Sequence, residues 1–413
     1  MSREPPALVT GAAHHRWILP GLLAAAVASR IAAALLAGGS SFRFVDEALY
    51  ADAAEHLRAG AGLPAYAADA PGYPIFLALL GLVAPGGVLA LRVAQGMVVA
   101  VGALLCFELG RRLGGRPAGL TAAALFSLDP LLVVSSALLY PEATAGLLLT
   151  GALLLAWEAV RRERASLLAL AGLLLGFFTL FRPTGLALAP VMTGWIGTAP
   201  GQTWSRRAAR AAVLIGAWSL PLIPWAHRNY QAYGSLLPIS SQIRSVPVIG
   251  AEIGRIGVPG AIVTAVKRDP PGFTSRTLRE FAHFWELYPT RLVTDDGERR
   301  ESFAKQDPRL SAALLVRRSA RDLVSALSFG LELSLAIIGI VFAWRHRRRE
   351  ALWLVGVALS FALGYAVFHG KLRYRIPILP IVLAFAGLGA ASLGARLRQP
   401  RPRRAAEDPS VVA

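Results

Sequence analysis

Long apolar stretches separated by short arginine-rich loops form the main pattern of this chain. Stretches of about 18 or more apolar residues recur, and a helix of that length crosses the roughly 30 Å hydrocarbon core of a bilayer. A membrane β-barrel would instead need alternating segments of about 10 residues. The pattern predicts ten spans, near residues 17–37, 88–110, 117–136, 142–160, 166–181, 185–199, 208–226, 323–343, 351–369 and 376–395. We therefore expect an all-α polytopic membrane protein.

Arginine clusters mark one side of this arrangement. They occupy the loops 111–116, 161–164, 206–210 and 345–349, and the segment 396–404. Positively charged loops stay on the cytoplasmic side of a membrane. Ten spans place all of these clusters and both termini on that side. The pattern thus predicts a multi-pass protein of the plasma (inner) membrane.

One apolar segment is too short to be a span. Residues 71–87 hold only about a dozen apolar residues between Pro74 and Pro85, which is typical of a re-entrant or interfacial helix. Counting it as a span would also move every later arginine cluster to the outer side. The hydrophilic mass is then extracytoplasmic, in residues 38–87 and 227–322, and neither stretch has the apolar periodicity of an independent core.

Composition agrees with this architecture. The chain is 55% hydrophobic and only 16% charged, against roughly 25% charged residues in soluble domains. Its net charge of +18 lies mainly in the loops between spans, which argues against nucleic acid as a partner. The single Cys106 can form no disulfide within the chain. We expect a single transmembrane domain over 1–398 with extracytoplasmic juxtamembrane helices, and a disordered cytoplasmic tail at 399–413.

Two adjacent acids, Asp46 and Glu47, follow the first predicted span. Residues 45–59 have the pattern of a helix that ends at the following glycines. The residues on the Asp46 face are Leu49, Tyr50, Ala53 and Leu57. Glu47 points about 100° away, so we expect Asp46 at the head of the buried face and Glu47 at its flank. Stabilisation of the helix dipole and catalysis both explain first-turn acids.

Two more acids lie at or near predicted spans. Glu142 follows Pro141 at the start of the fourth span, where a dipole-stabilising role and a role in a site are both open. Asp129 precedes Pro130, and we expect it to cap a kinked half-helix. Arg30 lies in the first span, where it could pair with one of the acids.

The last outward loop is basic, although topology predicts an arginine-poor side. Its candidate residues are His369, Lys371, Arg373, Tyr374 and Arg375. A basic cluster at a membrane edge suits a lipid phosphate, although general contact with anionic headgroups also explains it. Arg182 and Arg228 are expected at the same level. Acids that activate a hydroxyl and bases that hold a phosphate together indicate a transferase with a lipid-phosphate donor.

The order of these motifs resembles that of the GT-C integral membrane glycosyltransferases, in particular the glycosyltransferase family 39 group. That group includes protein O-mannosyltransferases and the bacterial aminoarabinose transferases of lipid A. The motifs are DEALY, APGYPIFLALLGL, RVAQGMVVAVGALLCFELGRRLGG, YPE, FRPTG, PWAHRNY with the following YG and PIS, and LRYRIPILP. The resemblance covers most of residues 17–395.

The resemblance implies transfer of a sugar from a polyprenyl phosphate on the extracytoplasmic side, with inversion. By position, Asp46 matches the general base, and Glu142 the acid that helps to position acceptor or donor. The expected ligands of the donor phosphate are Lys371, Arg373 and Arg375, with Arg228 as a weaker match. Glu47 is a supporting residue. The further candidates for substrate binding are Tyr73, Arg182, His369 and Tyr374.

The chemistry requires no cofactor. A divalent cation could still bind to Asp46, Glu47, Glu142 and a histidine, but no ligand spacing demands one. The extracytoplasmic part is small and includes no large luminal module of the kind found in protein mannosyltransferases. This difference favours a lipid, a glycan or another cell-envelope acceptor, as in lipopolysaccharide biosynthesis, over a folded protein.

Two alternatives remain. A transporter or flippase of a lipid-linked sugar would also bind a polyprenyl phosphate, but transporters tend to have repeated halves and sites at the midplane. Here the acids lie at one membrane edge, and no internal repeat is visible. The other alternative is a catalytically inactive binding protein of the same fold, against which the retained Asp46 argues.

Overall fold

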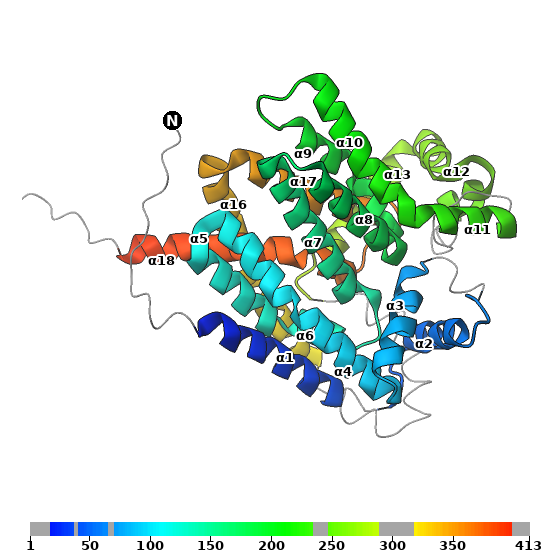
Figure 1. Ribbon diagram of the computed structural model, residues 1–413, viewed down its shortest axis with the longest axis horizontal. Coiled ribbons are helices and arrows are strands. Elements are labelled where there is room, and N and C mark those ends of the chain that lie inside the picture. The colour runs from blue at the N-terminus through cyan, green and yellow to red at the C-terminus, as the bar shows by residue number, and fades with distance from the viewer. Residues whose placement is uncertain (1–16, 37–39, 65–69, 234–246, 289–317, 399–413) are drawn as a thin grey trace, which may run out of the picture.

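The computed structural model describes residues 17–36, 40–64, 70–233, 247–288 and 318–398 (Figure 1). Within these ranges the secondary structure is helical and contains no strand. The predicted tail 399–413 and parts of the outer stretch 227–322 lie outside the described residues. The predicted all-α polytopic fold is confirmed.

The helices follow one another with short connections. In chain order they are α1 Ile18–Leu36, α2 Val45–Arg58, α3 Gly72–Val83, α4 Gly87–Ala100, α5 Gly102–Leu128, α6 Pro130–Ser136, α7 Pro141–Arg162, α8 Ala165–Phe181, η2 Pro183–Leu188, α9 Ala189–Gly197, α10 Trp204–Ser219, η3 Leu220–Leu222, α11 Ile223–Tyr233, α12 Pro247–Arg268, α13 Pro270–Phe284, α16 Arg318–His346, α17 Arg348–Ala366, η6 Leu372–Ile378 and α18 Leu379–Arg398. The elements labelled η are 3-10 helices.

Seven segments of the described chain are long and apolar enough to cross a membrane. They are Ile18–Leu36, Gly87–Leu128, Pro141–Arg162, Trp204–Gln231, Asp322–His346, Arg348–Ala366 and Leu372–Arg398. The second of these is 42 residues long and leaves the helical conformation at Gly114 and Gly115. It therefore contains the predicted span 88–110 and the larger part of the predicted span 117–136, whose last residues form α6. The predicted spans 166–181 and 185–199 correspond to the 17-residue α8 and to η2 with α9.

The short apolar segment forms α3, as the sequence indicated. This helix has 12 residues and is therefore about 18 Å long at 1.5 Å per residue. It is shorter than the hydrocarbon core, which measures about 30 Å. Helix α3 packs against α2 and α8, so it supports the outer loops instead of forming a further span.

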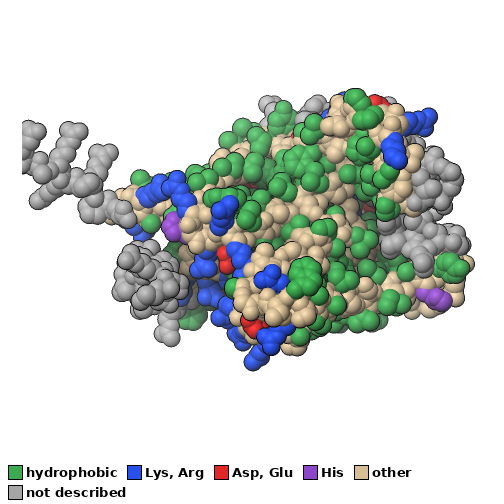
Figure 2. Space-filling view, turned by 90° about the horizontal axis from the view of Figure 1, so that it is seen from above, with side chains coloured by type: hydrophobic (Ala, Val, Ile, Leu, Met, Phe, Trp, Pro, Cys, Tyr) green, Lys and Arg blue, Asp and Glu red, His purple; other side chains and the backbone are tan. Residues whose placement is uncertain are grey.

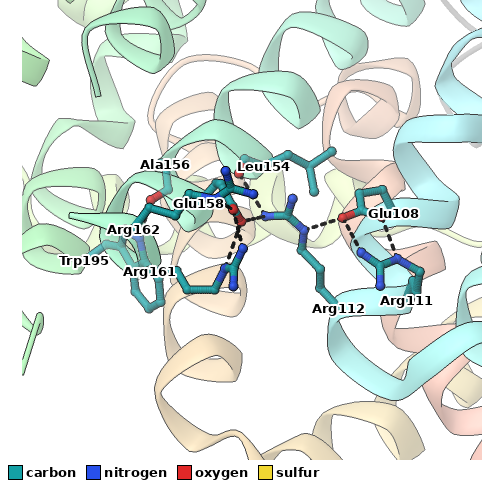
Figure 3. A network of polar contacts seen from close by, with 9 residues as sticks. All are labelled: Glu108, Arg111, Arg112, Leu154, Ala156, Glu158, Arg161, Arg162 and Trp195. Carbon is teal, nitrogen blue, oxygen red and sulfur yellow. Dashed lines mark hydrogen bonds and ion pairs between the residues drawn. The ribbon is translucent and has the colours of Figure 1, made fainter. Parts of the chain in front are cut away.

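The basic loops meet at one end of the molecule. Arg112 lies 3.4 Å from Glu158, and Arg210 donates a 2.8 Å hydrogen bond to the carbonyl of Ala159. Figure 3 shows Arg112 between Glu108 and Glu158. Its ion pairs with these two residues connect the first part of α5 to the end of α7. In Figure 2, Lys and Arg side chains gather mainly towards the end where α18 finishes, whereas hydrophobic side chains cover the middle. The membrane side that this end faces stays a prediction.

Helix α7 joins this basic end to the opposite end of the fold. Glu142 lies in its first turn and Glu158 near its last turn, a rise of about 24 Å at 1.5 Å per residue. The outer acids and the basic loops are therefore separated by most of the thickness of a bilayer. This separation is what the topology predicted from the sequence requires.

Helix α18 is held at the centre by close backbone contacts. It packs against α5 and α16, and its glycines allow that approach. A Cβ atom at Gly387 would lie 2.2 Å from the carbonyl oxygen of Ala118, and one at Gly389 would lie 2.0 Å from that of Leu335. Small residues at helix interfaces commonly serve this purpose in membranes. Because η6 leads directly into α18, this packing also fixes the segment that carries Arg373.

We predict that Gly339→Ala on α16 lowers the free energy of unfolding by about 1–3 kcal/mol, because overpacking forces helices apart. A Cβ atom there would lie 1.9 Å from the carbonyl oxygen of Phe385 on α18. The matched control is Gly330→Ala on the same helix, where the added Cβ meets nothing within 4 Å. Thermal unfolding in detergent measures both variants. Equal stability of the two variants would contradict the packing described for α16 and α18.

Candidate functional site

Four charged residues from distant parts of the chain form a cluster at the end opposite the basic loops. The Nη2 atom of Arg373 lies 3.3 Å from the Oδ2 atom of Asp46, and its Nε atom lies 3.4 Å from the Oε1 atom of Glu142. Arg182 forms an ion pair with the same oxygen of Glu142. We call Asp46, Glu142, Arg182 and Arg373 the charge cluster.

Local sequence places each member of the cluster at the end of an element. Pro141 occupies the first position of α7 and puts Glu142 in the first turn, as proline favours. Arg182 ends α8 with an extended backbone, because the residue before a proline avoids the helical region. Arg373 lies on η6, just before the long helix α18.

The two acids of the cluster differ in environment. The Glu142 side chain is 1% exposed and is enclosed between the guanidinium groups of Arg182 and Arg373. The Asp46 side chain is 46% exposed, and Arg373 is its one partner in the described chain. Glu142 is therefore fixed as a counter-charge, whereas Asp46 has a carboxylate oxygen available to a ligand.

Tyrosine rings frame the guanidinium groups. The Tyr374 ring centre lies 5.4 Å from the guanidinium carbons of both Arg182 and Arg373, and the Tyr140 ring lies 4.5 Å from that of Arg373. Such contacts stabilise a cation and fix its orientation. Burial raises the pKa of Tyr50, near the cluster, to about 12 and also raises the pKa of Tyr140. Both phenols are therefore neutral hydrogen-bonding groups at physiological pH.

Glu47 lies outside the cluster and is fully buried. Its carboxylate accepts hydrogen bonds from Arg92 Nη2 at 3.0 Å and from the backbone N–H of Leu139 at 2.8 Å. It also accepts the backbone N–H groups of Arg43 at 2.7 Å and Phe44 at 3.3 Å. Glu47 thus fastens the start of α2 to α4 and to the loop before α7, which positions Asp46 beside Glu142.

The predicted orientation of the two acids on α2 was wrong, although Ala53 of the predicted face is buried. Glu47 is fully buried, whereas Asp46 is half-exposed and Leu49 is 41% exposed. In a membrane protein an apolar face can meet lipid, so hydrophobicity does not identify the inward side of a helix. The buried partner Arg92 decides the orientation, because a buried carboxylate needs a counter-charge. The prediction of Glu47 as a supporting residue is untested by activity but fits these contacts.

Tyr73 supports the same loop. It is fully buried, and its hydroxyl donates a 2.6 Å hydrogen bond to the side-chain oxygen of Gln95. Gln95 in turn donates to the carbonyls of Ser136 and Leu138 at 3.1 Å and 2.7 Å. The structure gives Tyr73 a packing position, and its predicted contact with substrate stays a prediction.

The basic residues of the last outward loop point in different directions. His369 lies 3.4 Å from Glu280 on α13. Lys371 immediately precedes η6, is partly exposed and forms no ion pair with the described part of the chain. Arg375 is buried and turns away from the charge cluster, with its guanidinium carbon 3.4 Å from the centre of the Phe329 ring. Of the three predicted phosphate ligands, only Arg373 therefore contacts the acids.

Arg228 lies on α11, where its guanidinium carbon is 4.9 Å from the centre of the Trp225 ring. It also donates a 3.2 Å hydrogen bond to the side chain of its neighbour Asn229. These contacts give it a place on the surface of α11 and do not join it to the charge cluster. Its role in binding the donor stays a prediction.

Two intramembrane residues have structural partners. Asp129 caps α6 by accepting the backbone N–H of Leu132 at 2.5 Å, which confirms the predicted cap of a kinked half-helix. Arg30 donates to the carbonyls of Phe126 at 3.0 Å and Ser127 at 3.4 Å. These carbonyls belong to the last turn of α5, so Arg30 caps a helix end and forms no ion pair with an acid in the described chain.

Sequence reasoning missed Arg92 and Tyr140 as parts of the site. Arg92 lies within an apolar helix, and an arginine there is expensive unless it is paired or functional. That feature would have marked it as the partner of an outer acid. Tyr140 belongs to the quoted YPE motif, but its place beneath Arg373 depends on η6, which is far away in the sequence.

A metal site was left open by the sequence. Among the residues that the structure describes, no three His, Cys, Asp or Glu side chains gather closely enough to hold a metal ion. The charge cluster balances its two carboxylates with two guanidinium groups. Whether a divalent cation takes part stays a prediction.

Comparisons with known proteins show which family part of this chain matches and which solved structures share its fold. Residues 68–226 match the family described as dolichyl-phosphate-mannose-protein mannosyltransferase. No curated protein matches the chain. The crystal structure of the apo oligosaccharyltransferase from Archaeoglobus fulgidus is similar, with a TM-score of 0.58 and 14% identity over 94% of this chain. A structure of the archaeal oligosaccharyltransferase AglB from the same organism, in complex with an inhibitory peptide and a dolichol-phosphate, is also similar, with a TM-score of 0.59 and 15% identity over 94% of this chain.

The chain spans about half the length of these solved structures, 52% of the first and 51% of the second. At such low identity the likeness shows the fold. Together with the family match over residues 68–226, it confirms the resemblance to GT-C integral membrane glycosyltransferases that the order of the motifs indicated.

We predict that Glu47→Ala lowers the free energy of unfolding by about 3–5 kcal/mol, because it leaves the buried guanidinium of Arg92 without its counter-charge. The control is Glu55→Ala on the same helix, whose exposed carboxylate pairs with Arg58 at the surface. We expect that control to change stability by at most about 1 kcal/mol. Thermal unfolding of the purified proteins compares them. A loss no larger for Glu47→Ala than for Glu55→Ala would overturn the structural role of Glu47.

Proposed function

We propose that this protein is a glycosyltransferase that moves a sugar from a polyprenyl-phosphate donor to a hydroxyl of a lipid, glycan or other cell-envelope acceptor. One observation carries the proposal. A half-exposed carboxylate, Asp46, lies 3.3 Å from a guanidinium group, Arg373, which a second and buried carboxylate holds in place. A proton acceptor and an anion-binding group thus lie side by side at a membrane edge.

Asp46 acts as the general base in this reaction. A carboxylate oxygen of Asp46 accepts the proton of the acceptor hydroxyl. At the same time the oxygen of that hydroxyl forms a bond to the anomeric carbon. The bond between the anomeric carbon and the phosphate oxygen breaks, and the electron pair leaves with the polyprenyl phosphate. Attack opposite the leaving group inverts the anomeric centre. Glu142 is unsuited to this task, because two guanidinium groups enclose it.

Arg373 stabilises the leaving phosphate. Guanidinium groups form strong charge-assisted hydrogen bonds with phosphate oxygens, and stabilisation of the developing charge replaces a strong general acid. Lys371, two residues earlier and without an ion-pair partner in the described chain, supplies a second cation. Arg182 acts through Glu142, whose counter-charge sets the position of Arg373.

The comparisons support a lipid phosphate as the donor. The family that residues 68–226 match is described as dolichyl-phosphate-mannose-protein mannosyltransferase. One structure of similar fold is a complex with a dolichol-phosphate. The arrangement of charges at one membrane edge favours transfer at the extracytoplasmic surface of the plasma membrane.

We predict that Asp46→Asn lowers the rate of sugar transfer by about 10²–10⁴-fold, the range typical of a lost general base. Insertion into the membrane and binding of polyprenyl phosphate should persist. Asp52→Asn is the matched control, since Asp52 lies on the same helix with its side chain 57% exposed. Purified protein, labelled donor and a detergent extract of envelope acceptors allow the measurement. Full transfer by Asp46→Asn would exclude Asp46 as the base, and translocation of donor without covalent transfer would favour a flippase.

We predict that Arg373→Gln weakens binding of polyprenyl phosphate by about 10–100-fold, because a hydrogen bond to a charged group contributes about 1.5–3 kcal/mol. Arg58→Gln is the control, since Arg58 pairs with Glu55 on the surface of α2. Equilibrium binding of a fluorescent polyprenyl phosphate in detergent reports the affinity. Unchanged affinity in Arg373→Gln would remove this residue from the phosphate site.

A further inference from the structure

The loop that precedes η6 is bound by one buried acid, Glu280, of helix α13. The Oε2 atom of Glu280 accepts the backbone N–H of Gly370 at 2.8 Å. The same oxygen lies 3.4 Å from the Nδ1 atom of His369. A carboxylate that accepts a backbone N–H forms a charge-assisted hydrogen bond, which is one of the stronger kinds in proteins. Glu280 therefore fixes the chain at Gly370.

Helix α13 approaches this loop closely because residue 370 is a glycine. A Cβ atom at Gly370 would overlap the backbone carbonyl oxygen of Glu280. Helix α13 also packs against α17 and η6. Glu286, just after the end of α13, accepts a hydrogen bond from the side chain of Arg375 through its backbone carbonyl. Contacts with this segment thus lie on both sides of Arg373 in the sequence, at Gly370 and at Arg375.

Lys371 is the residue whose direction the contact at Gly370 controls. It follows Gly370 directly and has an extended backbone, with φ −131° and ψ 147°. Its carbonyl accepts the backbone N–H of Tyr374 at 2.9 Å, and the Tyr374 ring contacts guanidinium groups of the charge cluster. The Lys371 side chain is partly exposed and forms no ion pair with the described part of the chain. The backbone therefore sets where its ammonium group can reach.

We infer that Glu280 is a positioning residue of the outer site, which holds the N–H of Gly370 and thereby directs Lys371 towards the phosphate that Arg373 binds. The role of Lys371 in this inference rests on the proposed function, whereas the contact between Glu280 and Gly370 does not. In this role Glu280 touches the backbone and not the phosphate. A carboxylate that acted only through its charge would repel a phosphate. Positioning and simple electrostatics thus predict opposite effects when Glu280 is removed.

We predict that Glu280→Ala weakens binding of a fluorescent polyprenyl phosphate by about 3–10-fold, the range for one lost hydrogen bond, although it removes a negative charge. Glu280→Gln keeps a side-chain oxygen for the N–H of Gly370 and should bind at least as tightly as wild type. Glu55→Ala is the matched control, since it removes an exposed acid of α2, and it should leave the affinity unchanged. Tighter binding by Glu280→Ala, or an equal loss in Glu280→Gln, would overturn the positioning role.

Dependence on Lys371 distinguishes positioning from a general loss of structure. If Glu280 acts through Lys371, Glu280→Ala adds no further loss of affinity to that of Lys371→Ala, because mutations that remove one shared interaction are not additive. A loss of equal size with and without Lys371 would show that Glu280 only stabilises the fold, and would overturn the inference.

The contact itself can be measured without any donor. Hydrogen–deuterium exchange of the purified wild-type protein should be slow in peptides that cover Gly370, since its N–H is bonded to a buried carboxylate. Glu280→Ala should accelerate this exchange, whereas Glu280→Gln should not. Exchange in wild type as fast as in Glu280→Ala would overturn the contact. If wild-type protein fails to bind polyprenyl phosphate, the proposed function fails, while the exchange measurement still decides whether Glu280 holds Gly370.

Discussion

The outer end of this protein depends on the two ion pairs of Arg373, whose guanidinium group lies between Asp46 and Glu142. It joins α2, α7 and η6, elements that lie far apart in the chain. Arg182 adds α8 by binding the same buried carboxylate. Opposite charges in a poorly hydrated site attract strongly only when their geometry is fixed. The helices behind the cluster provide that geometry.

Buried polar groups fix the segments of the chain that carry the charge cluster. Glu47 binds Arg92 and the N–H of Leu139, so the start of α2 cannot move independently of the loop before α7. Arg375, two residues after Arg373 on η6, is buried and donates to the backbone carbonyl of Glu286. Buried charges are costly in a membrane protein unless they are satisfied. Here each one holds a loop that presents a group of the outer site.

Much of the architecture could be predicted from the sequence, because span length and arginine-rich loops are local properties. Asp129 was predictable as a cap for the same reason, since Pro130 follows it directly. The roles of Glu47 and Arg375 were not predictable in this way. The orientation of Glu47 depends on Arg92 and that of Arg375 on the ring of Phe329, partners distant in sequence. Lipid can also cover the apolar face that would be buried in a soluble protein. The motif order nevertheless identified Asp46, Glu142 and Arg373 as candidates.

A double-mutant cycle between Asp46 and Arg373 tests the central claim most directly. Initial rates of labelled sugar transfer would be measured for wild type, Asp46→Asn, Arg373→Lys and the double variant. If the two side chains act as one unit, the double variant is no slower than the slower single variant, because residues in contact are not additive. Losses that simply multiply would show that Asp46 and Arg373 act independently, and would contradict the charge cluster as the centre of the reaction.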